Sequence, residues 1–300
     1  MTPTDGVVLL DKPSGVSSFK ALRPVKKAVS GSKVGHTGTL DPFASGLLVV
    51  LTGRMTRIAP KLTGMDKTYE AVFRFGQETD TLDPEGETVL RAPVPERRCI
   101  DEHLAEFRGT ITQQPPQYSA VHVNGRRAYE RVRSGEEVIV PEREVRIDEF
   151  SPLSWRNPDL HVRIRASSGT YIRALARDLG RRCDSCAYVT WLRRTEVGPF
   201  SVEDALDTDT VDFEKLETGE FVLPPAEVFS DIPGILSATV PEDVVPKIRN
   251  GVPLSTSIVA DQLGLGPDTD DIALFSPDGI LLAVVVPSGG NLKYRFVCAR

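Results

Sequence analysis

The chain has 300 residues, of which 40% are hydrophobic and 26% are charged, and its formal net charge is −6. This composition is that of a globular protein, and it excludes collagen-like, low-complexity and wholly disordered chains. The longest apolar runs, at 47–51 and 280–286, fall far short of the roughly 18 residues that a membrane helix needs. Four cysteines make no disulfide framework, so the sequence predicts a reducing, cytoplasmic location.

Charge is distributed unevenly along the chain. Residues 1–200 hold 30 Lys and Arg against 25 Asp and Glu, whereas residues 201–300 hold 6 against 17. A basic part followed by an acidic part indicates two functional regions, and the basic part is a candidate to face a polyanion.

Apolar periodicity predicts the secondary-structure elements in chain order. Strands are expected at 6–10, 69–75, 118–123 and 160–166. Helices are expected at 18–29, 95–107 and 171–179, the last ended by Gly180. The segment 31–46 is typical of a glycine-punctuated loop, 203–233 of a linker or loose subdomain, and 235–300 of a small β module. Because strands and helices do not alternate strictly, we expect an α+β fold with a mixed or antiparallel sheet.

The loop at 35–42, GHTGTLDP, contains the first candidate for chemistry. Its glycines permit close backbone approaches, and Pro42 restricts Asp41 to an extended or turn geometry that presents the carboxylate stiffly. A plain Asp-Pro turn, in which Asp41 caps the backbone, is the competing interpretation. His36 alone is typical of a structural or surface histidine, and no other His or Cys stands at ligand spacing from it, so no metal site is expected there.

The segment SSGTYIR, at 167–173, contains the second candidate. If Thr170 is the N-cap, Arg173 lies in the first helical turn, where a cation opposes the helix dipole. That unfavourable position indicates an anionic partner, which is either a carboxylate such as Asp41 or an RNA phosphate. An exposed arginine whose flexible stem avoids the dipole is the alternative.

Aromatic and arginine side chains supply further candidates. Tyr69 opens a predicted strand and has a ring that can stack on a base and a hydroxyl that can handle a proton. Tyr118, Arg126 and Arg127 belong to a stretch in which arginines alternate with tyrosines, as on surfaces that bind phosphates and bases. A core aromatic and a solvated basic face are the competing interpretations. The acidic run at 78–87 lacks calcium-loop spacing, and Cys183 and Cys186 lack the second pair that a zinc site needs.

Six segments, taken together and in this order, resemble the bacterial TruB-type tRNA pseudouridine synthases. They are LLDKPSGVSS (9–18), VGHTGTLDPFASGLL (34–48), KTYEAVFRFGQETDTLDPEG (67–86), QPPQYSAVHVNGRRAYERVRSG (114–135), SSGTYIRALARDLG (167–180) and LRRTEVGPF (192–200). The resemblance covers most of residues 6–200 and overrides the competing interpretations above.

The resemblance implies isomerisation of uridine 55, in the T-loop of tRNA, to pseudouridine. It makes Asp41 the essential carboxylate, Tyr69 the base-stacking and proton-handling residue, and Arg173 the ion-pair partner of Asp41. It further implies substrate contacts or support of the site by Lys12, His36, Tyr118, Arg126, Arg127, Tyr171 and Leu192.

The family fold is a curved, largely antiparallel mixed sheet flanked by helices, expected here at residues 1–230, followed by a small β-rich, PUA-like domain at 231–300. The expected partner is the T-arm stem-loop of tRNA. We expect no cofactor, no metal, no membrane and no obligatory protein partner, and the chain is expected to be a monomer in the cytoplasm.

The chemistry agrees with this resemblance. An isomerisation that keeps every atom needs no redox cofactor, and one carboxylate suffices, as nucleophile or base at the ribose or the uracil. An adjacent Arg173 should lower the pKa of Asp41 and keep it ionised. A non-catalytic tRNA-binding or folding protein on the same scaffold is the second hypothesis. A glycosidase or nucleosidase is the third, and it would need a second acid near Asp41.

Overall fold

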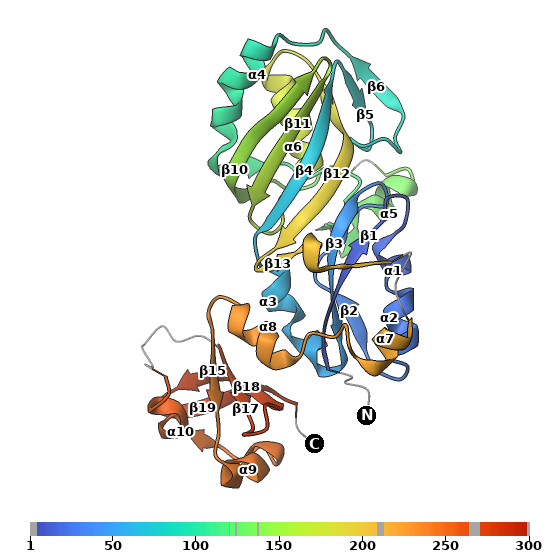
Figure 1. The fold of residues 1–300 in the computed structure, drawn as a ribbon. Helices are drawn as coiled ribbons and strands as arrows, with labels where there is room; N and C mark the ends of the chain where they lie inside the picture. The colour runs from blue at the N-terminus through green and yellow to red at the C-terminus, as the bar shows by residue number, and fades with distance from the viewer. Residues whose placement is uncertain are drawn as a thin grey trace.

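A computed structural model describes residues 5–119, 121–123, 125–136, 138–208, 213–263 and 271–298. A 10-stranded sheet and a 5-stranded sheet, with helices packed on them, make up most of the fold (Figure 1). The expected α+β class, with a strand-rich C-terminal part, is confirmed. No helix in the described ranges is long and apolar enough to span a membrane.

The large sheet is mixed but mainly antiparallel. Its strands, in spatial order, are β14 (Leu206–Asp207), β1 (Gly6–Lys12), β3 (Ser45–Thr52), β12 (Ala187–Val197), β4 (Lys67–Phe75), β11 (Asp159–Ala166), β10 (Arg143–Arg156) and β7 (Gly109–Gln113). Only the β1–β14 and β3–β12 pairs on this path are parallel. Two short strands, β2 (Val34–His36) and β13 (Phe200–Ser201), pair with β3 and β12.

Helices cover the sheet in two groups. The helices and 3-10 turns of this part are α1 (Ser18–Ala21), α2 (Arg23–Ala28), η1 (Gly53–Ile58), α3 (Ala59–Thr63), α4 (Arg97–Leu104), η2 (Ala105–Phe107), α6 (Ile172–Arg182), η3 (Val202–Asp204), α7 (Phe213–Thr218) and α8 (Pro225–Asp231). Apolar residues of α4 and α6, such as Ile100 and Leu175, are buried with Phe73 of β4 and Phe150 of β10. Helices α1, α2 and α7 bury a separate cluster against β1 and β3.

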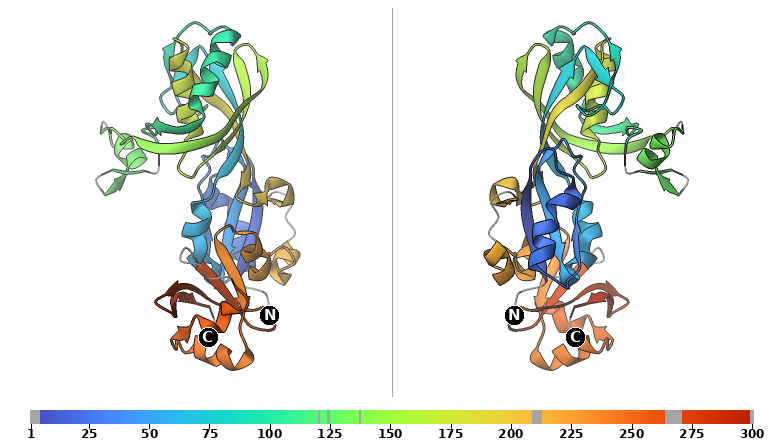
Figure 2. Two further views of the ribbon diagram at one scale, coloured as in Figure 1. Left: turned by 90° about the vertical axis from the view of Figure 1, so that its left-hand side faces the viewer. Right: turned by 90° about the vertical axis from the view of Figure 1, so that its right-hand side faces the viewer.

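An insertion between β7 and β10 projects from the body of the molecule (Figure 2). Its described elements are β8 (His122–Val123), β9 (Arg126–Arg127) and α5 (Ala128–Arg133). A second excursion, the hairpin of β5 (Gln77–Thr79) and β6 (Thr88–Arg91), follows β4.

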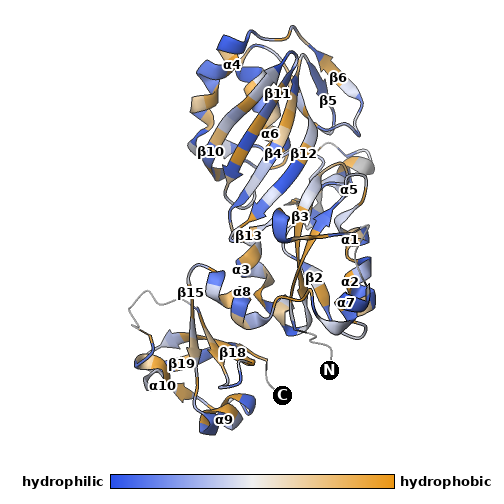
Figure 3. Ribbon diagram, in the orientation of Figure 1, coloured by the Kyte–Doolittle hydropathy of each residue, from blue (hydrophilic) through white to orange (hydrophobic). Residues whose placement is uncertain are grey.

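The second sheet has its own strands but shares a core with the first. Its order is β15 (Ile235–Thr239), β17 (Asp271–Phe275), β18 (Leu281–Ser288), β19 (Asn291–Val297) and β16 (Leu254–Ser255), with η4 (Glu242–Val244), α9 (Val245–Arg249) and α10 (Ser257–Ala260) beside it. The central strand β18 is strongly hydrophobic, as is β3 in the large sheet (Figure 3). Phe229 of α8 contacts Phe275 of β17 edge to face, and both belong to a buried cluster that includes Val7 and Leu47.

Several expected elements differ in the structure. The single helix expected at 18–29 is two helices, because Pro24 in the first turn of α2 cannot donate a backbone hydrogen bond. Helix α6 does not end at Gly180 but continues to Arg182. A Cβ on Gly180 would lie 2.6 Å from the backbone nitrogen of Ala187, so this glycine allows a close backbone approach and is not a cap.

Two other expectations need correction. The N-cap of α6 is Tyr171, whereas the hydroxyl of Thr170 donates to the carbonyl of Ser167. The segment expected to be a linker is packed: β14 pairs with β1, and Leu216 and Phe229 are buried. Of the strand expected at 118–123, β8 keeps only the last two residues, and residue 120 lies outside the described ranges.

Candidate active site

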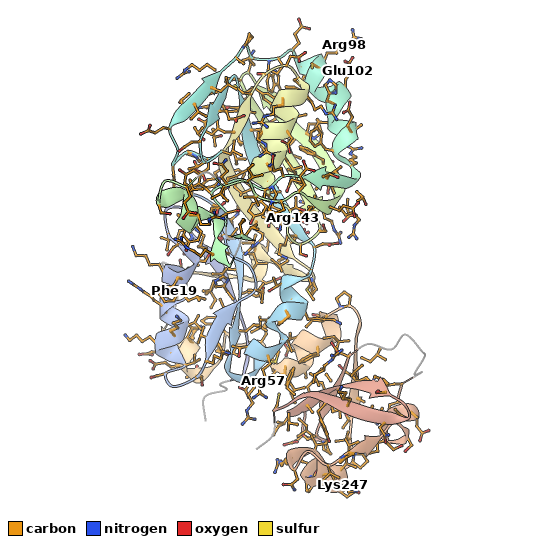
Figure 4. The ribbon with its side chains drawn as sticks, turned by 180° about the vertical axis from the view of Figure 1, so that it is seen from behind. Phe19, Arg57, Arg98, Glu102, Arg143 and Lys247 are labelled. Atoms are coloured by element: carbon orange, nitrogen blue, oxygen red, sulfur yellow. The ribbon has the colours of Figure 1, made fainter. Side chains whose placement is uncertain are left out.

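A cleft of about 810 Å³ brings together residues from six separate segments of the chain. Those that the sequence singled out and that line the cleft are Asp41, Tyr69, Tyr171, Arg173 and Leu192. Lys67 of β4, Arg143 of β10 and Arg194 of β12 line it as well. Arg143 marks this side of the molecule in the view from behind (Figure 4).

The expected ion pair between Asp41 and Arg173 is present. Oδ2 of Asp41 lies 2.9 Å from Nε of Arg173, although the N–H does not point along this contact. Only 4% of the Arg173 side chain is exposed, against 36% for Asp41. The carboxylate therefore faces the cleft while its partner is buried behind it.

Arg173 is held by further groups. Its Nη1 lies 3.1 Å from Oδ2 of Asp83 and donates to the carbonyl of Thr81 at 2.6 Å. Its Nη2 donates to the carbonyl of Tyr118 at 3.0 Å. Asp83 is itself buried, and it accepts hydrogen bonds from the Thr81 hydroxyl and from the backbone of Glu85. A buried guanidinium with this many partners has one fixed orientation.

The backbone on both sides of Asp41 is pinned by the segment that follows β1. The Ser18 hydroxyl accepts from the N–H of Leu40 at 2.9 Å and donates to its carbonyl at 3.0 Å. Ser14 donates to the carbonyl of Phe43 at 2.7 Å. Leu40 and Phe43 are buried in the core beneath α6. These contacts present the Asp41 carboxylate rigidly.

Lys12 belongs to the same support. Its Nζ donates to the carbonyls of Pro13, Val16 and Pro42, and the side chain is fully buried. Burial lowers the pKa of Lys12 to about 8, while the nearby Asp41 opposes that shift. Lys12 therefore supports the site, which is one of the roles that the resemblance implied, and its buried side chain does not reach the surface.

Burial outweighs the effect of Arg173 that the sequence predicted for the pKa of Asp41. Burial raises the pKa of Asp41 above its ordinary value, and the Asp83 carboxylate raises it further. Arg173 lowers that pKa, as expected, and Lys12 acts in the same direction, but burial outweighs both. Substrate therefore meets a carboxylate that is more basic than an ordinary aspartate.

Two more buried cations form one wall of the cleft. Arg194 donates to the carbonyls of Leu47 and Gly38, and Lys67 donates to those of Thr63 and Met65. Burial, with a contribution from Arg194, lowers the pKa of Lys67 to about 8. Buried cations that neutral carbonyls hold suit an incoming anion.

The N-terminal end of α6 closes the cleft on another side. The guanidinium of Arg143 lies 4.8 Å from the ring centre of Tyr171 and donates to the carbonyl of Gly169. The Tyr171 backbone is fixed by Gln113, whose side chain bonds both its N–H and its carbonyl. This stacked pair offers a flat, cationic edge to a ligand.

Other predicted site residues lie away from the cleft. His36 is half-buried beside it, its Nδ1 accepts from the N–H of Gly38 at 3.4 Å, and burial lowers its pKa. The side chain of Tyr118 lines a different cavity, of about 370 Å³, so only its backbone reaches Arg173. Arg126, on the insertion, pairs with Glu136 at 3.1 Å. The side chain of Arg127 is not among those that the structure describes.

Asp83 is the main residue that the sequence interpretation missed. It belongs to the acidic run that was rejected as a calcium loop. The fold determines its burial beside Arg173. The acidic run at 78–87 was nevertheless a sign in the sequence that one of these carboxylates could pair with a buried cation. In the described residues, no three His, Cys, Asp or Glu side chains are grouped so that they could hold a metal ion.

Comparison with known proteins identifies relatives of this chain. Residues 26–172 match the family model described as TruB family pseudouridylate synthase (N terminal domain). A protein of Borreliella burgdorferi named tRNA pseudouridine synthase B is 36% identical over 98% of both chains. Namesakes from Treponema denticola and Bordetella parapertussis are 48% and 46% identical over 68% and 69% of this chain. The matches cover 62% and 86% of those two proteins.

Solved structures show the same fold. A chain in the crystal structure of a Cbf5-Nop10-Gar1 complex superposes with a TM-score of 0.69 at 22% identity. A chain of an H/ACA RNP bound to a substrate RNA containing 2'-deoxyuridine gives 0.70 at 21%. Each alignment covers 98% of this chain and 85% of the other.

Proposed function

The chain belongs to the TruB family of pseudouridylate synthases, and on that premise we propose that it isomerises uridine 55 in the T-loop of tRNA to pseudouridine. Full-length relatives carry the name tRNA pseudouridine synthase B, which supports tRNA as the substrate. The observation that carries the proposal is the Asp41 carboxylate, half-exposed in the cleft and 2.9 Å from the buried Arg173.

The reaction breaks the N1–C1′ bond of the uridine, turns the uracil and forms a C5–C1′ bond. A proton leaves C5 and a proton is gained at N1, so atoms and electrons balance without a co-reactant. Asp41 supplies the carboxylate, as nucleophile or base. Its raised pKa strengthens it in either role.

Arg173 is a positioning residue that keeps the carboxylate aimed at the cleft. The fixed guanidinium also opposes protonation of Asp41. Tyr69 and Leu192 provide the aromatic and apolar surfaces against which a flat uracil stacks.

The target base lies within a folded loop, so it must be extruded at a cost of a few kcal/mol. Lys67 and Arg194 offset part of this cost by holding the phosphate of the extruded nucleotide, since both line the cleft and neither side chain bonds a carboxylate among the described residues. The stacked pair of Arg143 and Tyr171 holds a neighbouring nucleotide.

The decisive test is Asp41→Asn assayed by tritium release from tRNA transcript labelled at C5 of uridine. We expect isomerisation to vanish while tRNA binding survives, because the carboxamide keeps the shape but lacks the charge and basicity. Asp243→Asn, at a 74% exposed carboxylate on η4, is the matched control. Full activity of the Asp41 variant would refute the assignment. Loss of binding together with activity would favour a structural role.

We also propose that the enzyme acts as a cytoplasmic monomer, with residues 231–300 as a PUA-like domain. One buried core joins the two sheets within the chain, which supports a monomer that folds without a partner. Light scattering of the purified protein during size exclusion, with and without tRNA, tests the stoichiometry. A stable dimer would contradict it.

A further inference from the structure

The stretch between Asp11 and Asp41 contains six Lys and Arg residues and no Asp or Glu. Helices α1 and α2 lie in its middle. One of the six cations, Lys12, is the buried support of the catalytic loop. Of the other five, Lys26 is half-buried, and the exposed ones are Lys20, Arg23, Lys27 and Lys33.

Packing fixes which side of these helices faces outward. Ala21, Leu22 and Val25 are buried against β1 and β3, so the cations must lie on the opposite side. No carboxylate in the described part of the chain pairs with Lys20 or Arg23. A cluster of surface cations in which Lys20 and Arg23 are unpaired is typical of a surface that meets a polyanion.

An aromatic ring stands among these charges. Phe19 is 67% exposed, and the ammonium of Lys26 lies 4.0 Å from its ring centre. Its ring extends outward from α1 in the view from behind (Figure 4). Exposed rings interleaved with cations are the platforms on which proteins stack unpaired bases.

This surface adjoins the cleft through hydrogen bonds. Ser18, the residue before Phe19, bonds both backbone groups of Leu40, the residue before Asp41. Phe19 and Asp41 are therefore chain neighbours of two residues that are joined by hydrogen bonds.

We infer that the outward side of α1 and α2, which carries Phe19, Lys20, Arg23 and Lys27, is a second contact surface for the substrate RNA. Phe19 stacks on an unpaired base outside the cleft, and the three cations neutralise phosphates beside it. The inference rests on the proposed function, because it takes the tRNA in the cleft as the occupant. An exposed ring beside Lys20 and Arg23, which pair with no carboxylate among the described residues, favours RNA over an acidic protein face.

The first test isolates stacking. Phe19→Leu should weaken tRNA binding by about five- to 100-fold, the range that loss of one stacked base implies. Phe19→Trp should retain wild-type affinity, because the larger ring still stacks. We expect kcat to stay unchanged in both variants, since Phe19 touches no reacting atom. Equal affinities of Phe19→Leu and wild type would overturn the stacking role.

The second test isolates charge. In a variant with Lys20, Arg23 and Lys27 changed to Ala, the slope of log Kd against log salt should fall by about two to three. The control changes Arg91, Arg98 and Arg156 to Ala, three exposed arginines around the far end of the sheet from the cleft. An unchanged slope in the first variant, or an equal fall in both, would overturn the inference.

The two proposals fail in different ways. If wild-type protein binds tRNA without releasing tritium, the proposed function fails. The tRNA affinities of the variants would still test the contact surface. If wild-type protein isomerises tRNA and both sets of variants bind normally, only the surface is wrong. Binding of an acidic protein but not tRNA by this surface would also overturn the inference.

Discussion

At the scale of single residues, Arg173 is oriented by groups from three separate loops. Asp41 follows β2, Asp83 and Thr81 lie in the hairpin after β4, and Tyr118 belongs to the insertion. Asp83 and Arg173 are both buried, so each depends on the other to offset the loss of hydration.

Asp83→Asn should therefore lower kcat by roughly 10- to 100-fold, because a guanidinium without its second carboxylate shifts and misaligns Asp41. KM should change little, since Asp83 does not line the cleft. Single-turnover and steady-state kinetics separate these effects. Asp80→Asn, the same change at an exposed position of the same loop, is the control and should behave as wild type. A change confined to KM would contradict a positioning role.

The pH dependence of the rate follows from the charges around Asp41. The reaction needs the ionised carboxylate, so the rate should rise with pH through the pKa of Asp41, which lies above the ordinary 3.8. Removing Asp83 takes away a charge that raises this pKa, so Asp83→Asn should move the acid limb to lower pH. Arg173→Ala takes away a charge that lowers the pKa and should move the limb to higher pH. Rate profiles that shift together would contradict this electrostatic account.

The residues that the sequence predicted share one property. Asp41, Tyr69 and Arg173 lie in short segments that resemble one family, and this resemblance, rather than their local chemistry, decided between the competing interpretations. The role of Asp83 and the burial of Lys12 depend on contacts between distant segments, so local patterns do not contain them. The rise in the pKa of Asp41 was not predicted for the same reason, because it comes from burial, and burial is a property of the folded cleft.

At the scale of elements, the packing of α6 against β12 sets the position of Arg173. Gly180 lies where α6 comes close to the chain entering β12: a Cβ there would be 2.6 Å from the nitrogen of Ala187 and 2.7 Å from the carbonyl carbon of Cys186. Backbone atoms of a central strand cannot yield as a side chain can.

Gly180→Ala should therefore destabilise the protein by about 1–3 kcal/mol or more, although alanine favours helix by about 1 kcal/mol. The cause is steric overlap that moves α6 away from β12. Thermal unfolding followed by circular dichroism measures it. Gly35→Ala is the control, because its Cβ would meet only Thr56 at 4.0 Å and should leave Tm nearly unchanged. A higher Tm for Gly180→Ala would show that the helix propensity of alanine outweighs the steric overlap with β12.

Sequence periodicity located several elements, but it left out long strands such as β10 and β12 and misjudged several ends and connections. A glycine after an apolar helix is usually a cap, so Gly180 was interpreted as a stop although tertiary packing explains it. The segment with many Pro, Thr, Asp and Glu residues was expected to be loose. Its few apolar residues, such as Leu216 and Phe229, are nevertheless buried, and burial outweighs polar composition.

At the scale of the whole molecule, the acidic excess after residue 200 includes a cavity that is rich in carboxylates. The insertion and the segment from η3 to α7 lie on opposite sides (Figure 2). A cavity of about 360 Å³ on the latter side has a rim of four carboxylates: Asp204, Glu220, Glu227 and Asp231. These carboxylates disfavour an RNA that approaches over this cavity.

The two sheets should unfold together, because one buried cluster joins them. Phe229 is fully buried and contacts Phe275 in the second sheet, while its cluster extends to Leu47 and Val7 in the first. Phe229→Ala should lower the free energy of unfolding by about 3–5 kcal/mol. In calorimetry we expect one transition, shifted as a whole to a lower temperature. Leu236→Ala, at a 37% exposed position of β15, should change it little. The contrary result would be two separate transitions, of which Phe229→Ala shifts only the less stable one. In that case the C-terminal sheet folds independently, and the expected boundary near residue 230 separates two cooperative units.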